Sequence, residues 1–349
     1  MPEQLPKRID MLLWQLSELI QNLQILYNFQ KSAILSWMKK LAIGIDMGGT
    51  NMRLALVSED GTVINSIRHK TSAQEGKDAI ISRLSSATLD MIAEGRRDGT
   101  VVGIGIGAPG LIENGVVRYS PNLPGWKEVP LQKLLENALS LPVVLENDAN
   151  AVAYGEKSSG AGKGFNSLIC ITLGTGVGGG LILDGKIWRG AFGMAGEVGH
   201  MVVEPEGLQC SCGNRGCLEP YASATGIVRA AREAVNKGDA AWDIDNLTTE
   251  MLDAAARGGD MAAASLFAGA GRYLGIGIAS LLHILNPEAV VVGGGVSKGW
   301  DLFYPSMNEE IDKRCFREIV ERTKILPASL GDSAGMLGAA RLAFEKNKG

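Results

Sequence analysis

Ile43-Gly-Ile-Asp46-Met-Gly48-Gly49-Thr50-Asn-Met-Arg-Leu-Ala-Leu56 recurs in outline as Ile169-Cys-Ile-Thr172-Leu-Gly174-Thr175-Gly176-Val-Gly-Gly-Gly-Leu-Ile182. Each stretch has an apolar strand, a turn rich in glycine and threonine, and a second apolar strand. Two hairpins of the same design predict a duplicated architecture, with two lobes that each present a glycine turn to a shared cleft.

The segments around the hairpins predict an α/β protein. Strands are expected at 41–46, 52–57, 62–69, 101–106, 142–145 and 289–292, and helices at 76–95, 131–139, 217–235, 247–257, 262–285, 299–315 and 333–346. We expect an N-terminal lobe at 41–155 and a C-terminal lobe at 156–331, with the last helix, within 332–349, packing back on the first lobe.

Residues 1–40 form an extension before the first lobe. Its leucines and isoleucines follow helical spacing, which predicts an amphipathic helix. The helix is either an extension outside the main fold or a surface for a partner or a second copy. It lacks the basic start and uninterrupted apolar core of a signal peptide.

The overall composition limits the function classes. The chain has 349 residues, 46% hydrophobic and 21% charged, with a formal net charge of -4. This balance argues against a general attraction to nucleic acid or anionic membranes, and the apolar runs are shorter than the ~18 residues of a membrane span. Five cysteines, three of them in metal-like spacing, indicate a reducing compartment, the cytoplasm.

The glycine turns are candidate phosphate sites. Backbone N–H groups in such turns point inward and can hold phosphate oxygens, and the hydroxyls of Thr50 and Thr175 can add donors. The alternative is that each is only a tight turn. Residues 160–164 do not match a Walker A sequence, and the two Gly-x-Gly-x-x-Gly runs precede strands, not the helix that a dinucleotide site requires.

Two aspartates end strands at the expected cleft. Asp46 can hold Mg²⁺, directly or through water, or serve only as a turn residue. Asp148, in Glu146-Asn-Asp-Ala-Asn150, is either the N-cap of the next helix or a general base. Asn122, in the turn at 121–126, offers an amide that suits a polyol but is a weak signal by itself.

The strongest single signal is a zinc set made of His200, Cys210, Cys212 and Cys217. Three thiols and an imidazole complete a tetrahedral site, so the metal is expected to be structural. The alternative is a disulfide with a stray thiol. Glu197 and Glu219 flank the set, and the second ring nitrogen of His200 is free for an outer contact.

Together these motifs resemble the ROK family of sugar kinases and sugar-responsive repressors. The resemblance covers residues 38–346 and rests on the segments at 46–51, 107–110, 121–126, 146–150, 173–180, 196–200 and 210–219. It implies a two-lobed actin/hexokinase-like (ribonuclease H-like) fold with duplicated phosphate hairpins and a structural zinc site.

The resemblance also implies ATP-dependent phosphorylation of a hexose, with Asp148 as general base. The residues implied for sugar binding are Gly110, Asn122, Asn147, Asp148, Glu197, His200 and Glu219. Those implied for ATP are Gly48, Gly49, Thr50, Asn51, Gly174, Thr175, Gly176, Gly178, Gly294 and Gly295, with Gly293 beside them. Asp46 would hold Mg²⁺ through water, and Zn²⁺ would brace the sugar site.

Within the family, Asn122, Glu219 and the Pro-Gly-Trp turn resemble the glucokinase branch, so glucose with ATP is the first expectation. Kinases for N-acetylmannosamine or fructose, a polyphosphate donor, a sugar-sensing repressor and a non-catalytic binding module remain alternatives. Against the repressor, the N-terminal extension is short for a DNA-binding domain and has no basic stripe. The resemblance further implies a homodimer or higher homo-oligomer.

Overall fold

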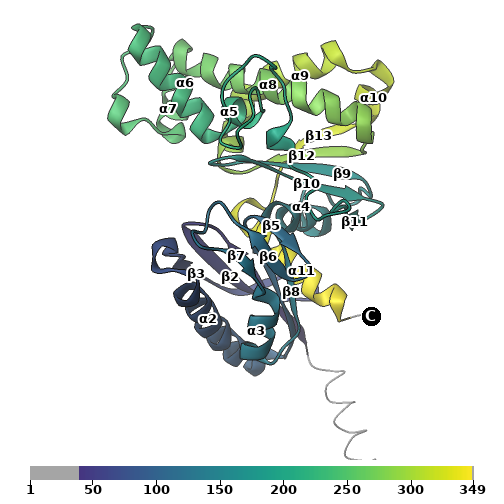
Figure 1. The fold of residues 1–349 in the computed structure, drawn as a ribbon. Helices are drawn as coiled ribbons and strands as arrows, with labels where there is room; N and C mark the ends of the chain where they lie inside the picture. The colour runs from purple at the N-terminus through teal and green to yellow at the C-terminus, as the bar shows by residue number, and fades with distance from the viewer. Residues whose placement is uncertain (1–38, 348–349) are drawn as a thin grey trace, which may run out of the picture.

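The computed structural model describes residues 39–347 (Figure 1). Within them the chain forms two five-stranded sheets of the same design and one three-stranded sheet. The amphipathic helix expected in residues 1–40 falls almost wholly outside the described residues. The orders are β3-β2-β1-β4-β8 and β11-β10-β9-β12-β13, and in each the first three strands are antiparallel and the last three parallel. The predicted duplication is confirmed.

The strands of the two large sheets correspond in chain order. The first sheet consists of β1 (Lys40–Met47), β2 (Asn51–Ser58), β3 (Val63–Lys70), β4 (Thr100–Ala108) and β8 (Val143–Asn147). The second consists of β9 (Leu168–Leu173), β10 (Val177–Leu183), β11 (Lys186–Ile187), β12 (Ala289–Gly293) and β13 (Lys324–Pro327). The small sheet, which the sequence analysis did not include as a unit, contains β5 (Leu111–Glu113), β6 (Val116–Tyr119) and β7 (Lys127–Val129).

Both faces of the first sheet are covered, so its central strands are almost wholly apolar. Alternate residues of β1 face different helices: Leu41 and Ile43 pack with α2 (Lys77–Asp98) and α3 (Leu131–Leu139), whereas Ala42 packs with α11 (Ala334–Lys346). Small residues on this second face let α11 approach closely. A Cβ on Gly44 would lie 1.9 Å from the carbonyl oxygen of Met336.

Two helices, α11 and α4 (Asp148–Ser159), lie between the large sheets and join them (Figure 1). Helix α4 packs on α11 and also on β9 and β10 of the second sheet. The predicted boundary between residues 155 and 156 therefore falls inside a helix that contacts both sheets. The division of the chain into lobes at that point stays a prediction.

Glu156 ties the two connections between the sheets to α4. Its side chain is fully buried, and its carboxylate accepts hydrogen bonds from the backbone N–H groups of Ala161 (2.8 Å) and Leu330 (2.9 Å). Ala161 belongs to the segment entering the second sheet, and Leu330 to the segment returning to α11. Because a buried carboxylate needs donors to offset its lost hydration, this residue holds both crossings together.

Helices cover the outer face of the second sheet: α5 (Glu219–Ala222), α6 (Ala224–Lys237), α7 (Thr249–Arg257), α8 (Met261–Leu285), α9 (Trp300–Arg314) and α10 (Arg317–Arg322). The single helix expected at 217–235 is wrong, because Ser223 is extended between α5 and α6 and its side chain accepts a hydrogen bond from the Gly226 N–H. A serine in this position is a typical N-cap, so α6 starts anew there.

Helix α8 is long and apolar enough to cross a membrane by length and composition, and 56% of its apolar window is buried within the protein. It packs against α5, α6, α7 and α9. Phe267, Leu274 and Ile278 are buried in the core of the second lobe. These contacts are those of a core helix, and a core helix can be as long and as apolar as a membrane span.

Candidate active site

A cleft of about 570 Å³ lies between the two sheets. Many of the predicted site residues line it: Asp46, Gly110, Asn122, Asn147, Asp148, Gly174, Gly176, Gly178, Glu197, His200, Glu219 and Gly294. Six predicted ATP residues are not among its lining, namely Gly48, Gly49, Thr50, Asn51, Thr175 and Gly295. The structure thus brings the residues predicted for sugar binding together in one cleft, and the roles of both the sugar and the phosphate residues stay predictions.

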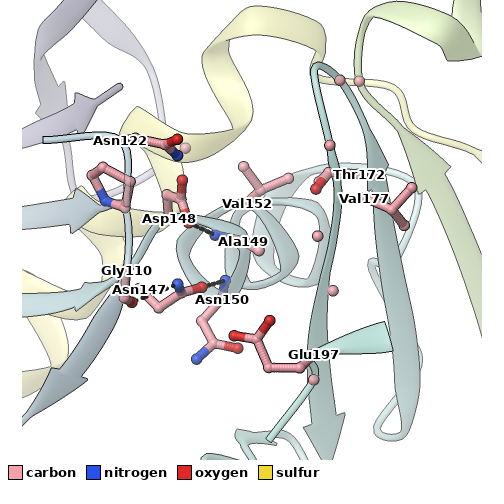
Figure 2. A pocket seen from close by; sticks show the side chains of 18 of the residues that line it. Gly110, Asn122, Asn147, Asp148, Ala149, Asn150, Val152, Thr172, Val177 and Glu197 are labelled. Carbon is pink, nitrogen blue, oxygen red and sulfur yellow. Dashed lines mark hydrogen bonds between the residues drawn. The ribbon is translucent and has the colours of Figure 1, made fainter. Parts of the chain in front are cut away.

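Asp148 is the first residue of α4, at the point where β8 ends. The cap of this helix is Asn147, whose side chain accepts a hydrogen bond from the Asn150 N–H at 3.1 Å. Asp148 instead accepts a hydrogen bond from the Ala149 N–H at 2.9 Å, and its carboxylate points into the pocket toward Asn122 (Figure 2). The N-cap alternative for Asp148 is therefore wrong.

The surroundings of Asp148 disfavour its charge. Removal of the carboxyl group from water is the largest cause, and it raises the pKa to about 6, with further contributions from the nearby charges of Asp46 and Glu197. The hydrogen bond from Ala149 acts in the opposite direction. A carboxylate with a pKa near 6 is mostly ionised at neutral pH and is a better proton acceptor than an exposed aspartate.

Both the oxygen and the nitrogen of the Asn147 side-chain amide form hydrogen bonds. Besides capping α4, it donates through Nδ2 to the carbonyl oxygen of Gly110 at 3.2 Å. Gly110 has a φ of 109°, and a Cβ there would lie 2.3 Å from the carbonyl oxygen of Tyr119. Asn147 and Gly110 thus fix one another, so that the Asp148 end of β8 is tied to the small sheet.

Glu219 links the zinc loop, defined here as residues 200–217 with the four predicted ligands, to the second glycine turn. Its Oε2 accepts a hydrogen bond from the Val177 N–H at 3.0 Å. A Cβ on Gly176 would lie 2.3 Å from the same oxygen, so only glycine leaves room for the carboxylate. The turn after β9 and the start of α5 are therefore built around one carboxylate.

The four predicted zinc ligands converge. The ligand atoms of His200, Cys210, Cys212 and Cys217 all lie within 4.8 Å of one another. The Sγ atoms of Cys212 and Cys217 are 3.7 Å apart, and Cys210 Sγ is 3.7 Å from His200 Nδ1. Zn–S bonds of about 2.3 Å in a tetrahedron place two sulfurs about 3.8 Å apart, whereas a disulfide needs about 2.05 Å.

The cluster therefore fits a four-coordinate zinc, and the alternative of a disulfide with a stray thiol is wrong, since all five cysteines are free. The imidazole of His200 turns Nδ1 toward the thiols and leaves Nε2 on the cleft side, 4.0 Å from Oε2 of Glu197. The same imidazole can thus bind the metal through Nδ1 and present Nε2 to the cleft.

Comparison with known proteins agrees with this geometry. The ROK family model matches residues 42–346. The chain belongs to the ROK family. It is 39% identical to a glucokinase of Thermotoga maritima over 312 residues, which covers 87% of this chain and 97% of that protein. It is 32% identical to the xylose repressor of Bacillus subtilis over 308 residues, 87% of this chain and 77% of the repressor.

Solved structures of ROK proteins share the fold. A ROK family glucokinase from Streptomyces griseus, solved in complex with glucose and AMPPNP, superposes with a TM-score of 0.75 at 37% identity. The match covers 87% of this chain and 99% of that one. The two-lobed actin/hexokinase-like fold expected for this ROK chain is confirmed.

Two charged residues that line the cleft, Arg53 and Asp332, were not predicted from the sequence. Arg53 Nη1 lies 3.5 Å from Oδ2 of Asp46, and Arg53 Nη2 donates to Asp332 at 2.8 Å. Loss of hydration is the largest cause that raises the pKa of Asp46, and Arg53 partly opposes it. Arg53 could have been found, because it pairs directly with Asp46 across the hairpin. Asp332 has no local signal.

Proposed function

We propose that this ROK protein is an ATP-dependent glucokinase that transfers the γ-phosphoryl group of ATP to the 6-hydroxyl of glucose, giving glucose 6-phosphate. The observation that carries this proposal is the carboxylate of Asp148, which points into the interlobe cleft and has a pKa of about 6. The glucokinases among its relatives, matched over nearly their whole length, support the choice of reaction and of sugar.

In the proposed reaction, the 6-hydroxyl oxygen of glucose attacks the γ-phosphorus of ATP. Its proton passes to a carboxylate oxygen of Asp148 while the new O–P bond forms. The bond from the γ-phosphorus to the bridging oxygen breaks, and ADP leaves with the electron pair. Phosphoryl transfer depends mainly on alignment and on neutralising charge, so a carboxylate is a sufficient base.

The sugar is bound by side chains from both lobes. Asn122 lies beside Asp148 on the first lobe (Figure 2). Glu197, His200 and Glu219 line the same cleft from the second lobe. Because Asn147 and Gly110 bond to one another, we assign them mainly to holding Asp148 in place, with their remaining lone pairs for the sugar. Amide and carboxylate groups suit a polyol, which both donates and accepts hydrogen bonds.

ATP occupies the other part of the cleft. The glycine turns after β1 and β9, with Gly294, offer backbone N–H groups to its phosphates. Asp46 is a hard oxygen ligand of the kind Mg²⁺ prefers, and we assign it to the metal through a water molecule. Mg²⁺ bound with ATP neutralises phosphate charge, and Arg53, a lining residue beside Asp46, adds a fixed positive charge.

Zn²⁺ is proposed as a permanent structural ion held by His200, Cys210, Cys212 and Cys217. It would clamp the segment that carries Glu197 and Glu219 toward the sugar. Thiolate ligands need a reducing environment, which supports a cytoplasmic location. We also expect a homodimer or higher homo-oligomer, which light scattering after size-exclusion chromatography would measure.

A sugar-sensing regulator is the second candidate, favoured by the similarity to the xylose repressor. The repressor match covers 77% of that protein, whereas the glucokinase match covers 97%. The two functions separate by experiment. An assay of ADP release with glucose, mannose, fructose and N-acetylmannosamine, each with ATP or polyphosphate, is expected to give its highest kcat/KM with glucose and ATP.

Another sugar or donor with a higher kcat/KM would refute the substrate assignment. Absence of transfer to every sugar, together with sugar-dependent retardation of promoter DNA in a gel, would replace the kinase by the regulator.

A further inference from the structure

An ion pair between a buried carboxylate and a half-exposed guanidinium connects the two walls of the cleft, beside the residues proposed to bind the sugar. Glu146, next to Asn147 near the end of β8, is only 3% exposed. Its Oε2 accepts a hydrogen bond from Nε of Arg189 at 2.7 Å and lies 2.5 Å from Nη2 of the same guanidinium. Two guanidinium nitrogens thus approach one carboxylate oxygen, and charge-assisted contacts of this kind are short and strong.

The other oxygen of Glu146 organises the start of α4. Oε1 accepts hydrogen bonds from the backbone N–H of Asn147 and from Nδ2 of Asn150, both at 3.0 Å. These two residues flank Asp148, whose side chain points into the pocket (Figure 2). The carboxylate of Glu146 therefore sets the backbone and side-chain positions on both sides of the proposed base.

Arg189 belongs to the opposite lobe, in the segment between β11 and η2 (Val198–His200). This segment is closed on itself, because the carbonyl oxygen of Arg189 accepts a hydrogen bond from the Ala195 N–H at 3.1 Å. Gly196 then packs against β10, where a Cβ would lie 2.7 Å from the carbonyl oxygen of Gly179. Glu197 follows immediately. When the ion pair fixes the position of Arg189, it therefore also restrains the backbone that leads to Glu197.

We propose that the Arg189–Glu146 ion pair positions the sugar-binding residues of the two lobes relative to one another, and so sets sugar affinity without touching the sugar. Neither residue lines the cleft, but each is bonded to a neighbour that does. The proposal rests on the proposed sugar kinase function. It assigns Arg189 and Glu146 as positioning residues, separate from the groups that contact substrate.

The alternative is an ion pair that only stabilises the fold. The two ideas predict different kinetics. A protein that is merely less stable has fewer active molecules, which lowers the apparent kcat and leaves KM unchanged. A misplaced sugar site raises the KM for sugar and leaves the KM for ATP nearly unchanged.

The test uses Arg189→Gln, Glu146→Gln and the double variant in the full-length protein. Arg257→Gln is the matched control, because Arg257 also forms an ion pair through two guanidinium nitrogens, with Asp301 at 2.8 and 2.9 Å, but lies on the outer helices. Each single change near the cleft is expected to raise the KM for glucose by roughly tenfold or more. The KM for ATP should stay within twofold, and the control should change neither.

Two further results make the test decisive. The double variant should cost little more than either single one, because both remove the same interaction, and Arg189→Lys should recover part of the affinity. Amide hydrogen exchange should rise in Arg189→Gln at residues 147–150 and 190–197 together. An unchanged glucose KM, equal changes in the KM for both substrates, or unchanged exchange at those segments would overturn the proposal.

The exchange measurement does not depend on activity. If the wild-type protein phosphorylates no sugar, the proposed function fails, and the exchange result still decides whether the ion pair connects the two segments. If Glu146→Gln does not fold, Arg189→Gln and Arg189→Lys alone carry the same comparison.

Discussion

Asp148 illustrates how one side chain acquires its chemistry from its neighbours. Its position at the start of α4 makes it a candidate for a cap, but Asn147 already fills that role. Its carboxylate is thereby left for the cleft, where reduced hydration raises the pKa to about 6. The residue type alone would allow either role, and the local hydrogen bonds separate them.

Asp148→Asn is expected to abolish most phosphoryl transfer. The amide keeps the shape of the side chain but cannot accept the proton, so kcat should fall by about 10²–10⁴-fold. The Kd for glucose, measured by calorimetry without ATP, should change only severalfold. A purified variant with near wild-type kcat would refute the assignment of the base.

The pH dependence of the reaction follows from the same residue. The base must be ionised, so kcat/KM for glucose should rise with pH through a midpoint near 6 and then level off. The same raised pKa means that the folded state holds this proton to higher pH than the unfolded chain does. Its contribution to stability is therefore greatest at low pH and is lost as pH rises through about 6.

A pH–rate profile measured with buffers of constant ionic strength checks this prediction. A midpoint near the ordinary aspartate value of about 4 would contradict the environment described for Asp148.

At the scale of elements, close contact between backbones decides how α4 and α11 pack. Glycines in β1, β4, α4 and α11 allow carbonyl groups to lie where side chains would otherwise be. A Cβ on Gly338 of α11 would lie 1.8 Å from the carbonyl oxygen of Ala151 in α4. The helices that join the two sheets therefore depend on the absence of side chains at particular positions.

Gly105→Ala is expected to destabilise the fold. The new Cβ would lie 1.7 Å from the carbonyl oxygen of Ala339 in α11, and neither backbone can move cheaply. Such overpacking costs about 1–3 kcal/mol. Gly269→Ala in α8 is the control, because the added methyl meets nothing within 4 Å there, and it should stabilise by about 0.5–1 kcal/mol.

Urea unfolding monitored by circular dichroism measures both changes. Equal stability of the Gly105 variant and the wild type would show that α11 does not rest on β4 as described.

The geometry of the zinc loop is expected to depend on the bound metal. Protein purified without added zinc should hold one zinc per chain by elemental analysis. Cys212→Ala should lose the metal, raise the KM for glucose and lower the melting temperature, because the segment that carries His200 and Glu219 is released. Cys315→Ala, which removes a thiol outside the cluster, is the control.

Retention of zinc by the Cys212 variant, or loss of zinc with an unchanged KM and melting temperature, would contradict the bracing role.

At the scale of the whole molecule, the duplicated hairpins determine the architecture. Both hairpins could be recognised in the sequence, because each has its two apolar strands and its glycine turn within one short segment. Longer-range features left no such signal. Arg189 and Glu146 are 43 residues apart, and Arg53 and Asp332 are 279 apart. Such pairs exist only once the sheets are stacked.

The residues proposed for sugar binding could be predicted for a similar reason. Asn122, Asp148, Glu197 and Glu219 each lie in a short recognisable motif, and the fold brings all four to one cleft. The phosphate half was predicted less completely, since Thr50 and Thr175 lie outside the cleft lining. Turn residues contact a ligand through backbone groups, whose directions depend on the closed arrangement of both lobes.

The proposed function of the whole molecule is transfer of a phosphoryl group from ATP to the 6-hydroxyl of glucose. Phosphorus and carbon NMR of a mixture of the protein, Mg²⁺, ATP and ¹³C-labelled glucose tests it most directly. Equal amounts of ADP and glucose 6-phosphate are expected with the wild-type protein, and at least about 10²-fold less of both with Asp148→Asn over the same early time interval. Phosphorylation at another carbon, or no phosphorylated sugar at all, would contradict it.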